Sequence, residues 1–474
     1  MNVMFVYSLY NIASITKPLK TPEIIQFGIS YISSYLKANG HNTRLLILSR
    51  LSGKANEALI LENINRFKPK VIAFTAVSSE YPFIVETARF IRKHFPDKYF
   101  IIGGPHVSMN PDGVLDDFDA LCVSEGEMPM LELVNQLESG NEPSGINNLW
   151  IKNKNGVKKN PARPFLSELD RLPFPDRDMW NEWIDDKPNT RFSVLLGRGC
   201  PFECTYCCNH VLKKLSPGQY TRYRSPENIV SEIREIVEKY PDKNEIYLEV
   251  ENIGIKKEWV VDLCARLAEF NGTQKQPISF GANLRIIPNM DLRSIFKAFK
   301  QSNFRFVNIG LESGSEKIRR DILKRDYSND DIIKAAETAR EFGLQVSFLN
   351  MIGIPGETEK EFKETIELNR ICRPDWTGYS IFYPYQGTVL YDYCEKLGLL
   401  NDSLPTEMER EKATLDLPGF SKKRIDYNYN WFEYFVFKGR KPLPLLLAKA
   451  FWLKLRSSLR LFNFYRKLRN KKYY

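Results

Sequence analysis

The stretch LLGRGCPFECTYCCNH, residues 195–210, places Cys200, Cys204 and Cys207 in a C-x3-C-x2-C array. A fourth cysteine, Cys208, follows directly, so half of the chain's eight cysteines fall within this one loop. Cysteine thiolates bind zinc ions and iron–sulfur clusters. Clustered cysteines in a chain of 474 residues that begins without a signal-peptide pattern indicate a metal site in a reducing compartment rather than disulfides.

The spacing of the thiols leaves two kinds of metal site open. A structural zinc ion takes four ligands, and His210 would supply the fourth. Three thiols on one loop can instead hold three corners of a 4Fe–4S cube and leave one iron open to an exchangeable ligand. Tyr206, directly before the third cysteine, is then expected to pack against the cluster or its ligand. We favour the cluster, because the remaining cysteines are scattered singly in apolar segments and are expected in the core: Cys122, Cys264, Cys372 and Cys394.

The first 140 residues alternate short apolar runs with amphipathic stretches. Strands are predicted at 2–8, 42–49, 71–77, 99–104 and 120–125. This rhythm is typical of a parallel sheet covered by helices on both faces, so residues 1–140 are predicted to form an α/β, doubly wound (Rossmann-like) domain. Ligands of such sheets sit at the carboxyl ends of strands. The loops there contain the candidate ligand contacts Ser78, Gly103, Gly104, His106 and Gly126.

Residues 141–190 are polar and turn-rich and are predicted to form a linker with a small β-hairpin. The strand–helix rhythm resumes over 191–400. Strands are predicted at 192–199, 245–250, 277–283, 304–312, 345–354 and 378–384. Six such units predict a partial or full (β/α) barrel of the TIM type, whose active site lies at the carboxyl ends of the strands. Residues 401–474 form a C-terminal extension.

The positive charge of the chain is concentrated in its last segment. The net charge is +10, yet residues 434–474 contain twelve Lys or Arg and no acidic residue. The remainder is nearly balanced, so nucleic-acid binding is not predicted. The sequence has no uncharged apolar run of ~18 residues, and we expect a cytoplasmic protein without a membrane span.

Within the basic segment, apolar residues recur at steps of three and four. They are Ala448, Phe451, Leu455, Leu459 and Phe462. The pattern predicts an amphipathic helix, which would either pack on the barrel or lie on an anionic lipid surface. We favour the lipid surface, with peripheral membrane contact, because nothing acidic in the segment balances the charge.

Five motifs occur in order along the chain and together resemble one family. They are CPFECTYC (200–207), GLESGS (310–315), GIPGET (353–358), PYQGTVLY (384–391) and, in the N-terminal part, IIGGPHVSMNP (101–111) with VSEGE (123–127). The cysteine motif resembles the signature of the radical S-adenosylmethionine (SAM) superfamily. The remaining motifs, and LDRLPFPDRD (169–178) as the hinge before the barrel, resemble the subgroup with an N-terminal cobalamin-binding domain. The resemblance covers about residues 1–400.

The resemblance implies a mechanism and a set of roles. The three cysteines would bind a 4Fe–4S cluster, and the amino and carboxylate groups of SAM would chelate its open iron. Reductive cleavage of SAM, with an electron from an external flavodoxin- or ferredoxin-type donor, would release methionine and a 5′-deoxyadenosyl radical. Glu312 and Ser313 are expected to hold SAM, Arg285 its ribose or carboxylate, and the backbone of Gly353 and Ile354 its adenine.

The chain departs from the family pattern in two places. Where the subgroup has paired aspartates, this chain reads EVEN (249–252), so Glu251 either reaches the SAM amino group or is a solvated strand-end carboxylate. None of the four histidines stands in a D-x-H-x-x-G loop. Cobalamin is therefore expected to bind without a histidine below cobalt, with His106 as a contact. A degenerate domain that binds no cobalamin is the alternative.

These observations predict an enzyme. The main hypothesis is a cobalamin-dependent radical SAM methyltransferase that acts on an unactivated carbon of a small-molecule or lipid-linked substrate. A second hypothesis is radical ring formation or carbon–carbon coupling without methyl transfer. A third, from a different class, is a non-catalytic zinc-binding or redox module.

Overall fold

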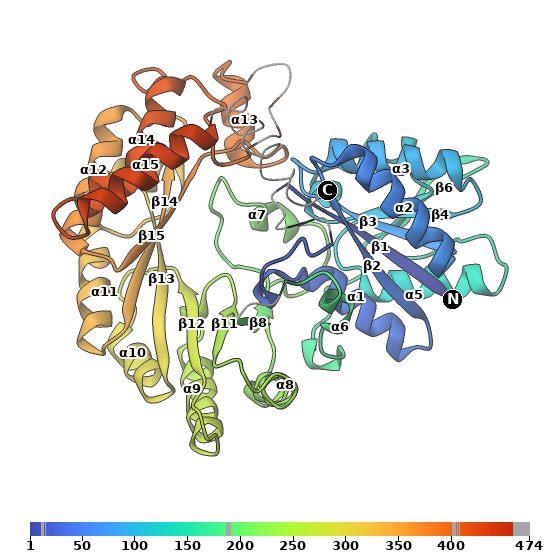
Figure 1. The fold of residues 1–474 in the computed structure, drawn as a ribbon, viewed down its shortest axis with the longest axis horizontal. Helices are drawn as coiled ribbons and strands as arrows, with labels where there is room; N and C mark the ends of the chain where they lie inside the picture. Colours follow the sequence, from blue (N-terminus) through green and yellow to red (C-terminus); the bar gives the residue numbers. More distant parts are fainter. Residues whose placement is uncertain are drawn as a thin grey trace. The chain divides into compact units, whose positions relative to one another are not determined.

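The computed structural model describes residues 1–10, 14, 16–185, 191–400, 404, 406 and 408–457. The chain divides into two compact units, which Figure 1 shows as ribbons. The first comprises Met1–Phe202, Cys207–Glu251 and Ala265–Phe280. The second comprises Glu203–Tyr206, Asn252–Cys264 and the chain from Gly281 onward. The residues of the cysteine loop are therefore divided between the units: Cys200 and Cys207 belong to the first unit, and Cys204 belongs to the second.

The first unit contains a seven-stranded sheet with the order β2-β1-β3-β4-β5-β6-β7. Its parallel strands are β1 (Asn2–Leu9), β2 (Asn42–Ser49), β3 (Val71–Thr75), β4 (Tyr99–Gly103) and β5 (Ala120–Cys122). All five strands predicted for residues 1–140 are confirmed. The hairpin predicted in the linker is also present, as β6 (Leu149–Asn153) and β7 (Gly156–Lys159). It adds to the same sheet, because β6 pairs antiparallel with β5.

The sequence accounts for this architecture directly. The central strand β1 is apolar and buried from Val3 to Tyr7, as expected for a strand covered on both faces. The covering helices are α1 (Phe27–Ala38), α2 (Gly53–Phe67), α3 (Tyr81–His94), α4 (Pro105–Met109) and α5 (Glu127–Glu138), and Figure 1 shows them on both sides of the sheet. The strand order reverses between β1 and β3, which is where such folds bind ligands.

The second sheet has the order β15-β14-β13-β12-β11-β8. Its strands are β8 (Phe192–Leu195), β11 (Glu245–Glu249), β12 (Ser279–Leu284), β13 (Phe304–Glu312), β14 (Gln345–Ile352) and β15 (Trp376–Ile381). All six predicted strands are confirmed, and they follow one another in sequence order. Helices alternate with them: α8 (Pro226–Lys239), α9 (Lys257–Gly272), α10 (Leu292–Gln301), α11 (Asn329–Glu341) and α12 (Glu359–Cys372). The described residues therefore form a six-stranded, partial barrel sheet rather than an eight-stranded one.

A two-stranded ribbon precedes and follows the cysteine loop. It consists of β9 (Gly197–Arg198) and β10 (Arg222–Tyr223), paired antiparallel. A Cβ at Gly197 would lie 2.4 Å from the Arg222 carbonyl oxygen, so the close pairing requires glycine. The helix that follows, α8, begins as the sequence predicts, because Ser225 Oγ accepts a hydrogen bond from the Asn228 N–H.

The C-terminal extension adds helices α13 (Val389–Lys396), α14 (Lys422–Phe437) and α15 (Leu443–Ser457). The predicted basic helix is confirmed as α15, which packs against α14, whereas Leu459 and Phe462 lie outside the described residues. The expectation that nothing acidic balances its charge is wrong for two side chains. Lys449 pairs with Glu433, and Arg456 pairs with Glu411 at 2.7 Å. Within the described part of the chain, no helix has the length and apolarity needed to cross a membrane.

Candidate active site

The cysteine loop runs from β9 to α7 (Asn209–Leu212). Cys204 is buried, Cys200 and Cys207 are half-buried, and all eight cysteines of the chain, which lie in the described part, are free thiols. Gly199 takes a left-handed conformation, and a Cβ there would lie 2.3 Å from the Tyr220 carbonyl oxygen. The tight entry to the loop therefore depends on glycine.

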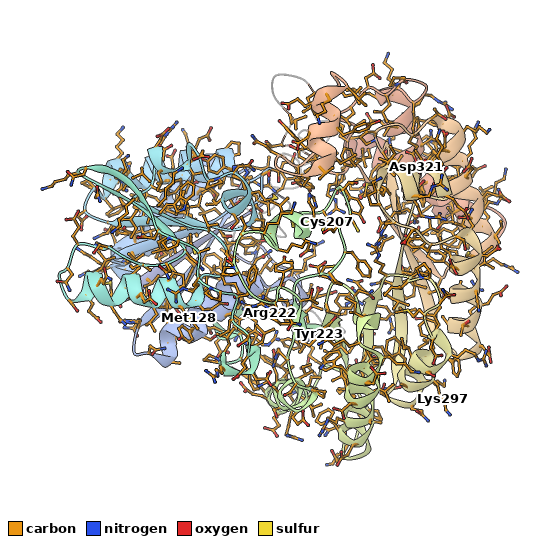
Figure 2. All side chains as sticks on the ribbon, turned by 180° about the vertical axis from the view of Figure 1, so that it is seen from behind. Met128, Cys207, Arg222, Tyr223, Lys297 and Asp321 are labelled. Atoms are coloured by element: carbon orange, nitrogen blue, oxygen red, sulfur yellow. The ribbon has the colours of Figure 1, made fainter. Side chains whose placement is uncertain are left out.

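Cys207 sits in a polar environment within the first unit, beside α7 (Figure 2). Asn209 Nδ2 donates to its sulfur at 3.4 Å, and Tyr220 OH donates to Asn209 Oδ1 at 2.6 Å. The neighbouring Cys208 thiol and Asn209 lower the pKa of Cys207 to about 7, while the pKa of Cys208 is raised by Cys207 and by burial. The structure thus favours the thiolate form at Cys207 over Cys208.

Glu251 lies near this thiol. Glu251 follows the end of β11, and its side chain is exposed. Its negative charge raises the pKa of Cys207, whereas the hydrogen bonds described above lower it. The structure therefore places Glu251 toward the cysteine loop. Its predicted contact with the SAM amino group stays a prediction.

Cys204 has a cationic neighbour within the second unit. Arg285, which follows β12 and is buried, donates from Nη1 to the Cys204 sulfur at 2.6 Å. The Arg285 N–H in turn donates to Asn252 Oδ1 at 3.0 Å, which fixes the backbone from which the guanidinium extends. Arg285 is therefore held at a cluster cysteine, and its predicted contact with SAM stays a prediction.

Free thiols with neighbouring N–H groups are chemically suited to an iron–sulfur cluster. The three thiols are unpaired by disulfides, and N–H groups of Asn209 and Arg285 point at two of the sulfurs. Hydrogen bonds to cluster sulfurs are one of the ways in which proteins set the reduction potential. Among the described residues, no three His, Cys, Asp or Glu side chains converge as a ready metal-binding group. This applies equally to the cysteines and to a zinc set that would use His210.

Glu312 ends β13 in an unusual backbone conformation. Its φ is +63°, in the left-handed region, and the strand register shifts between Gly310 and Glu312. A non-glycine residue with this φ is strained and is found most often at functional sites. Its carboxylate pairs with Arg325 Nη1 at 2.6 Å, and both side chains are largely buried.

The Glu312–Arg325 pair is part of a buried network that the sequence did not predict. Arg325 Nη1 also donates to the Tyr327 hydroxyl at 3.1 Å, and Tyr327 OH donates to the Gly310 carbonyl at 2.7 Å. Burial strongly raises the pKa of the Tyr206 hydroxyl, and the charges of Arg325 and Glu312 also influence this pKa. Tyr206 therefore lies close to the network. The second unit therefore brings the predicted residues Tyr206 and Glu312 together.

Ser313 and the loop after β13 are held in place by buried hydrogen bonds. Ser313 is fully buried, and its hydroxyl accepts from the Ser315 N–H at 3.3 Å. Arg319, also fully buried, donates from Nη1 to the Ser313 carbonyl at 2.5 Å. In this structure Ser313 thus stabilises the conformation of its own loop, and a contact with SAM stays a prediction.

Gly353 and Ile354 form the turn after β14. Both of their N–H groups donate to Oε2 of the buried Glu357, at 2.7 Å and 3.3 Å. Burial raises the pKa of Glu357 to about 8, and its Oε1 has no hydrogen-bond partner within the described residues. Both N–H groups are satisfied internally in this structure, and the predicted contact of this turn's backbone with adenine stays a prediction.

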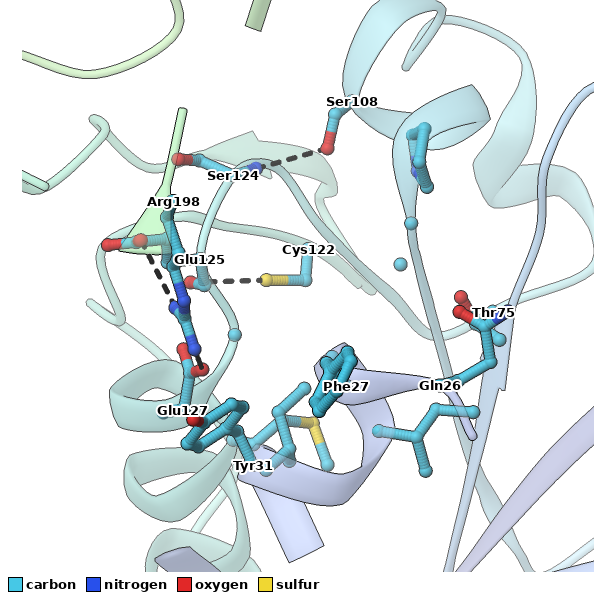
Figure 3. Close-up of a pocket in the computed structure, with 18 of the residues that line it drawn as sticks. Gln26, Phe27, Tyr31, Thr75, Ser108, Cys122, Ser124, Glu125, Glu127 and Arg198 are labelled. Atoms are coloured by element: carbon cyan, nitrogen blue, oxygen red, sulfur yellow. Dashed lines mark hydrogen bonds and ion pairs between the residues drawn. The ribbon is translucent and has the colours of Figure 1, made fainter. Parts of the chain in front are cut away.

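The first unit has a cavity of about 400 Å³ at the carboxyl ends of β3, β4 and β5 (Figure 3). Three of the five predicted ligand contacts, Gly103, Gly104 and Gly126, line it. Gly104 has a φ of +102°, and a Cβ there would lie 2.8 Å from both the Ala76 carbonyl and the Thr75 hydroxyl. Glycine is therefore required where the strand end meets the cavity.

The other two predicted contacts, Ser78 and His106, do not line the cavity. His106 Nδ1 is 3.2 Å from Ser78 Oγ, and the His106 ring packs on Tyr81 with centroids 4.4 Å apart. Burial lowers the pKa of His106, which keeps the ring neutral. His106 is thus a packed histidine of α4, and the structure does not bring it to the ligand site.

An ion cluster at one side of the cavity was missed from the sequence. Arg198 donates to Glu125 at 3.2 Å and to Glu127 at 2.5 Å, as Figure 3 shows, and its guanidinium lies over the Tyr31 ring. Arg222 pairs with Glu125 at 2.9 Å. Burial opposes the charge of Arg198, but the two carboxylates raise its pKa above the usual value. Arg198, Glu125 and Glu127 lie inside the quoted motifs, which was the available signal, whereas Arg222 lies outside them.

The chemical character of the walls of this cavity suits cobalamin. Glycines at the strand ends leave room for close approach, while the rings of Phe27 and Tyr31 and the polar side chains of Ser124 and Glu125 supply apolar and hydrogen-bonding surface. A corrin with amide side chains needs both kinds of wall. Arg198 and Gly199, which line the same cavity, directly precede Cys200 in the sequence.

Comparison with known proteins agrees with these two sites. Residues 194–368 match the radical SAM superfamily, and residues 21–134 match the B12 binding domain. The chain is 27% identical to an uncharacterized methyltransferase of Pyrococcus horikoshii, over 82% of each chain. It is 24% identical to the anaerobic magnesium-protoporphyrin IX monomethyl ester cyclase of Rubrivivax gelatinosus, over 77% of this chain and 65% of the relative.

The fold is also that of a solved enzyme of this kind. The radical SAM methyltransferase TsrM of Kitasatospora setae, solved with cobalamin and a 4Fe–4S cluster, superimposes with a TM-score of 0.65 at 14% identity, over 85% of this chain and 76% of TsrM. The cofactors of the present protein are a 4Fe–4S cluster, SAM and cobalamin, so it is an enzyme and not a zinc-binding module. The chain belongs to the radical SAM superfamily and carries a B12 binding domain ahead of its radical SAM domain.

Proposed function

We propose that the protein is a cobalamin-dependent methyltransferase that methylates an unactivated carbon. The observation that carries this proposal is the shared wall of the cavity in the first unit. The ends of β3 and β4 line it from one side, and Arg198 and Gly199, next to the first cluster cysteine, line it from another. When bound, the cluster supplies the electron that splits SAM, and cobalamin carries the methyl group.

The residues of the cysteine loop and of the β13 end have distinct roles in this proposal. Cys200, Cys204 and Cys207 hold the cluster, and Cys208 is a neighbour that does not. Glu312, oriented by Arg325, accepts hydrogen bonds from SAM. Tyr206, which burial keeps in its neutral form, closes the apolar side of the SAM site.

Gly103, Gly104 and Gly126 would contact the bound cobalamin. We propose that no protein nitrogen lies below cobalt, because His106 is engaged by Ser78 and Tyr81 and does not line the cavity. The ion cluster of Arg198, Glu125 and Glu127 offers charged hydrogen-bonding groups to the amide side chains of the corrin.

Radical ring formation without methyl transfer is the second candidate, and it is favoured by one observation. One of the relatives described above is a ring-forming cyclase. The two candidates are separated by incubating the reduced enzyme, under anaerobic conditions, with candidate substrates and SAM that carries a trideuterated methyl group. Methyl transfer predicts a product heavier by one CD3 group. A product that loses hydrogen and gains no label would overturn the methyltransferase proposal and support the cyclase.

The proposed reaction needs partners. An external one-electron donor of the flavodoxin or ferredoxin type would reduce the cluster, and the substrate would be a small molecule or a lipid-linked one. We also propose that the enzyme works as a peripheral protein at a membrane surface. The excess of basic residues in 434–474 supports this placement.

A further inference from the structure

Helix α15 carries several large apolar side chains that are partly exposed to solvent. Leu445, Phe451, Trp452 and Leu455 are 67%, 58%, 43% and 40% exposed. The steps from 445 to 452 and from 452 to 455 are of seven and three residues, so these side chains lie along one side of the helix. Large apolar side chains gathered at the surface mark an interaction site rather than ordinary surface composition.

The opposite side of α15 is already used. Leu446 and Ala450 are buried on that side, whereas the Phe451 ring, at the edge of the exposed face, makes an edge contact with Trp431 of α14, with centroids 5.9 Å apart. Lys449 and Arg456 reach back to Glu433 and Glu411 of the same unit. Figure 1 shows α14 and α15 side by side. One face therefore fixes the helix to the protein, and the apolar face is presented outward on a rigid support.

The charge of the segment indicates which kind of partner binds this face. Of the six basic residues in 434–457, the described part of this segment, Lys449 and Arg456 form ion pairs, and residues 434–474 contain no acidic residue. Lys454 is exposed beside the apolar face. An apolar helix face with tryptophan, phenylalanine and an adjacent lysine, in a segment rich in basic residues, matches the boundary of an anionic bilayer, where rings enter the headgroup layer and cations meet lipid phosphates.

We infer that the exposed face of α15, formed by Leu445, Phe451, Trp452 and Leu455, is a docking surface for anionic lipid. The inference deepens the peripheral placement proposed above and names the surface that makes it. It does not depend on the reaction, because neither the cysteine loop nor the cavity contributes to this face.

The test measures binding of the full-length holoenzyme to sedimenting vesicles. The vesicles contain phosphatidylcholine alone or phosphatidylcholine with 30% phosphatidylglycerol, as a stated probe composition. The variant Leu445→Gln/Trp452→Gln/Leu455→Gln removes the apolar face without changing charge. The matched control, Val157→Gln/Val261→Gln/Ile371→Gln, changes three exposed apolar side chains elsewhere, which are 46%, 40% and 52% exposed. Fluorescence of a polarity-sensitive dye and thermal melting verify that both variants remain folded.

We expect the wild type and the control to bind anionic vesicles, and the α15 variant to bind at least tenfold more weakly. We expect neutral vesicles to bind little, and 0.5 M salt to weaken binding to anionic ones. Equal binding of the α15 variant and the control would overturn the inference.

Two other occupants would each give a recognisable result that also overturns the inference. If a second copy covers the face, light scattering shows a dimer that the α15 variant converts to monomer. If the chain's own residues 458–474 cover it, truncation after Ser457 raises vesicle binding although six basic residues are lost. The lipid-surface inference predicts that this truncation lowers binding.

Discussion

Replacing Arg325 by methionine removes the cation that faces Glu312 inside the second unit. The Arg325 side chain is 7% exposed and that of Glu312 is 12% exposed, with 2.6 Å between Nη1 and Oε1. Methionine keeps the volume of the arginine stem but leaves the carboxylate buried without its partner. Arg325 also donates to the Gly310 carbonyl, at 3.2 Å, so the variant loses a support of the irregular end of β13 as well.

The magnitude follows from the burial of both partners. Removing one member of a buried ion pair costs about 3 to 5 kcal/mol, because the remaining charge is stranded. For a unit of this size that corresponds to a melting temperature lower by roughly 10 °C. The double variant Glu312→Gln/Arg325→Met strands no charge and should recover about half of the loss or more. Arg293→Met is the matched control, since it breaks a pair with Glu341 in which both side chains are more than half exposed.

The assay combines thermal unfolding, followed by circular dichroism, with anaerobic calorimetric titration of SAM. Arg325→Met should be strongly destabilised and should bind SAM at least tenfold more weakly, because Glu312 loses its orientation. The control should match the wild type in both measurements. The reasoning is refuted if Arg325→Met melts with the wild type, or if the double variant is no more stable than the single one.

Three further predictions concern the cysteine loop, the turn after β14 and the cavity. Alanine at any of the three positions of the C-x3-C-x2-C array should abolish the cluster, measured as iron and sulfide per chain, whereas Cys208→Ala should retain it; the reverse result at Cys207 and Cys208 would contradict the ligand assignment. Because burial raises the pKa of Glu357 from 4.5 to about 8, the folded state holds a proton that the unfolded state releases, so stability is highest below pH 4.5 as far as this group is concerned and is lost as the pH rises toward 8. Glu357→Gln should remove this loss of stability, which amounts to roughly 3 to 4 kcal/mol between pH 5 and pH 8 in denaturant titrations, and an unchanged loss would assign the pH dependence elsewhere. Gly104→Ala, with its Cβ 2.8 Å from two oxygen atoms, should lower cobalamin retention at least tenfold, while Gly113→Ala, at another left-handed glycine whose Cβ meets nothing within 4 Å, should retain it; equal retention would contradict the close approach.

The fold followed from the sequence because its signals are local. The parallel strands of both sheets are mostly apolar runs bounded by turn residues, and β1 is so apolar that its burial on both faces was foreseeable. The hairpin of β6 and β7 was also visible, but its pairing with β5 was not, because register across a linker depends on tertiary packing.

The candidate site was predicted only in part, and the misses have one physical reason. Motifs identify residues next to a ligand, whereas ion pairs such as Arg198 with Glu127 join positions far apart in the sequence. Arg325 in KRDYS carries no pattern that points to Glu312, although the strained φ of Glu312 shows that the pair matters locally. The GGPH stretch makes His106 the plausible histidine contact, but its packing on Tyr81 depends on tertiary structure and cannot be predicted from spacing.

The central claim is that the cavity at the carboxyl ends of β3, β4 and β5 holds cobalamin without a protein nitrogen below cobalt. The most direct measurement is cobalt analysis and electron paramagnetic resonance of the anaerobic holoenzyme in its cob(II)alamin form. The account predicts one cobalt per chain and a spectrum without superhyperfine splitting from a nitrogen ligand. A spectrum with nitrogen splitting that disappears in His106→Ala, or no cobalt retained after reconstitution, would contradict it.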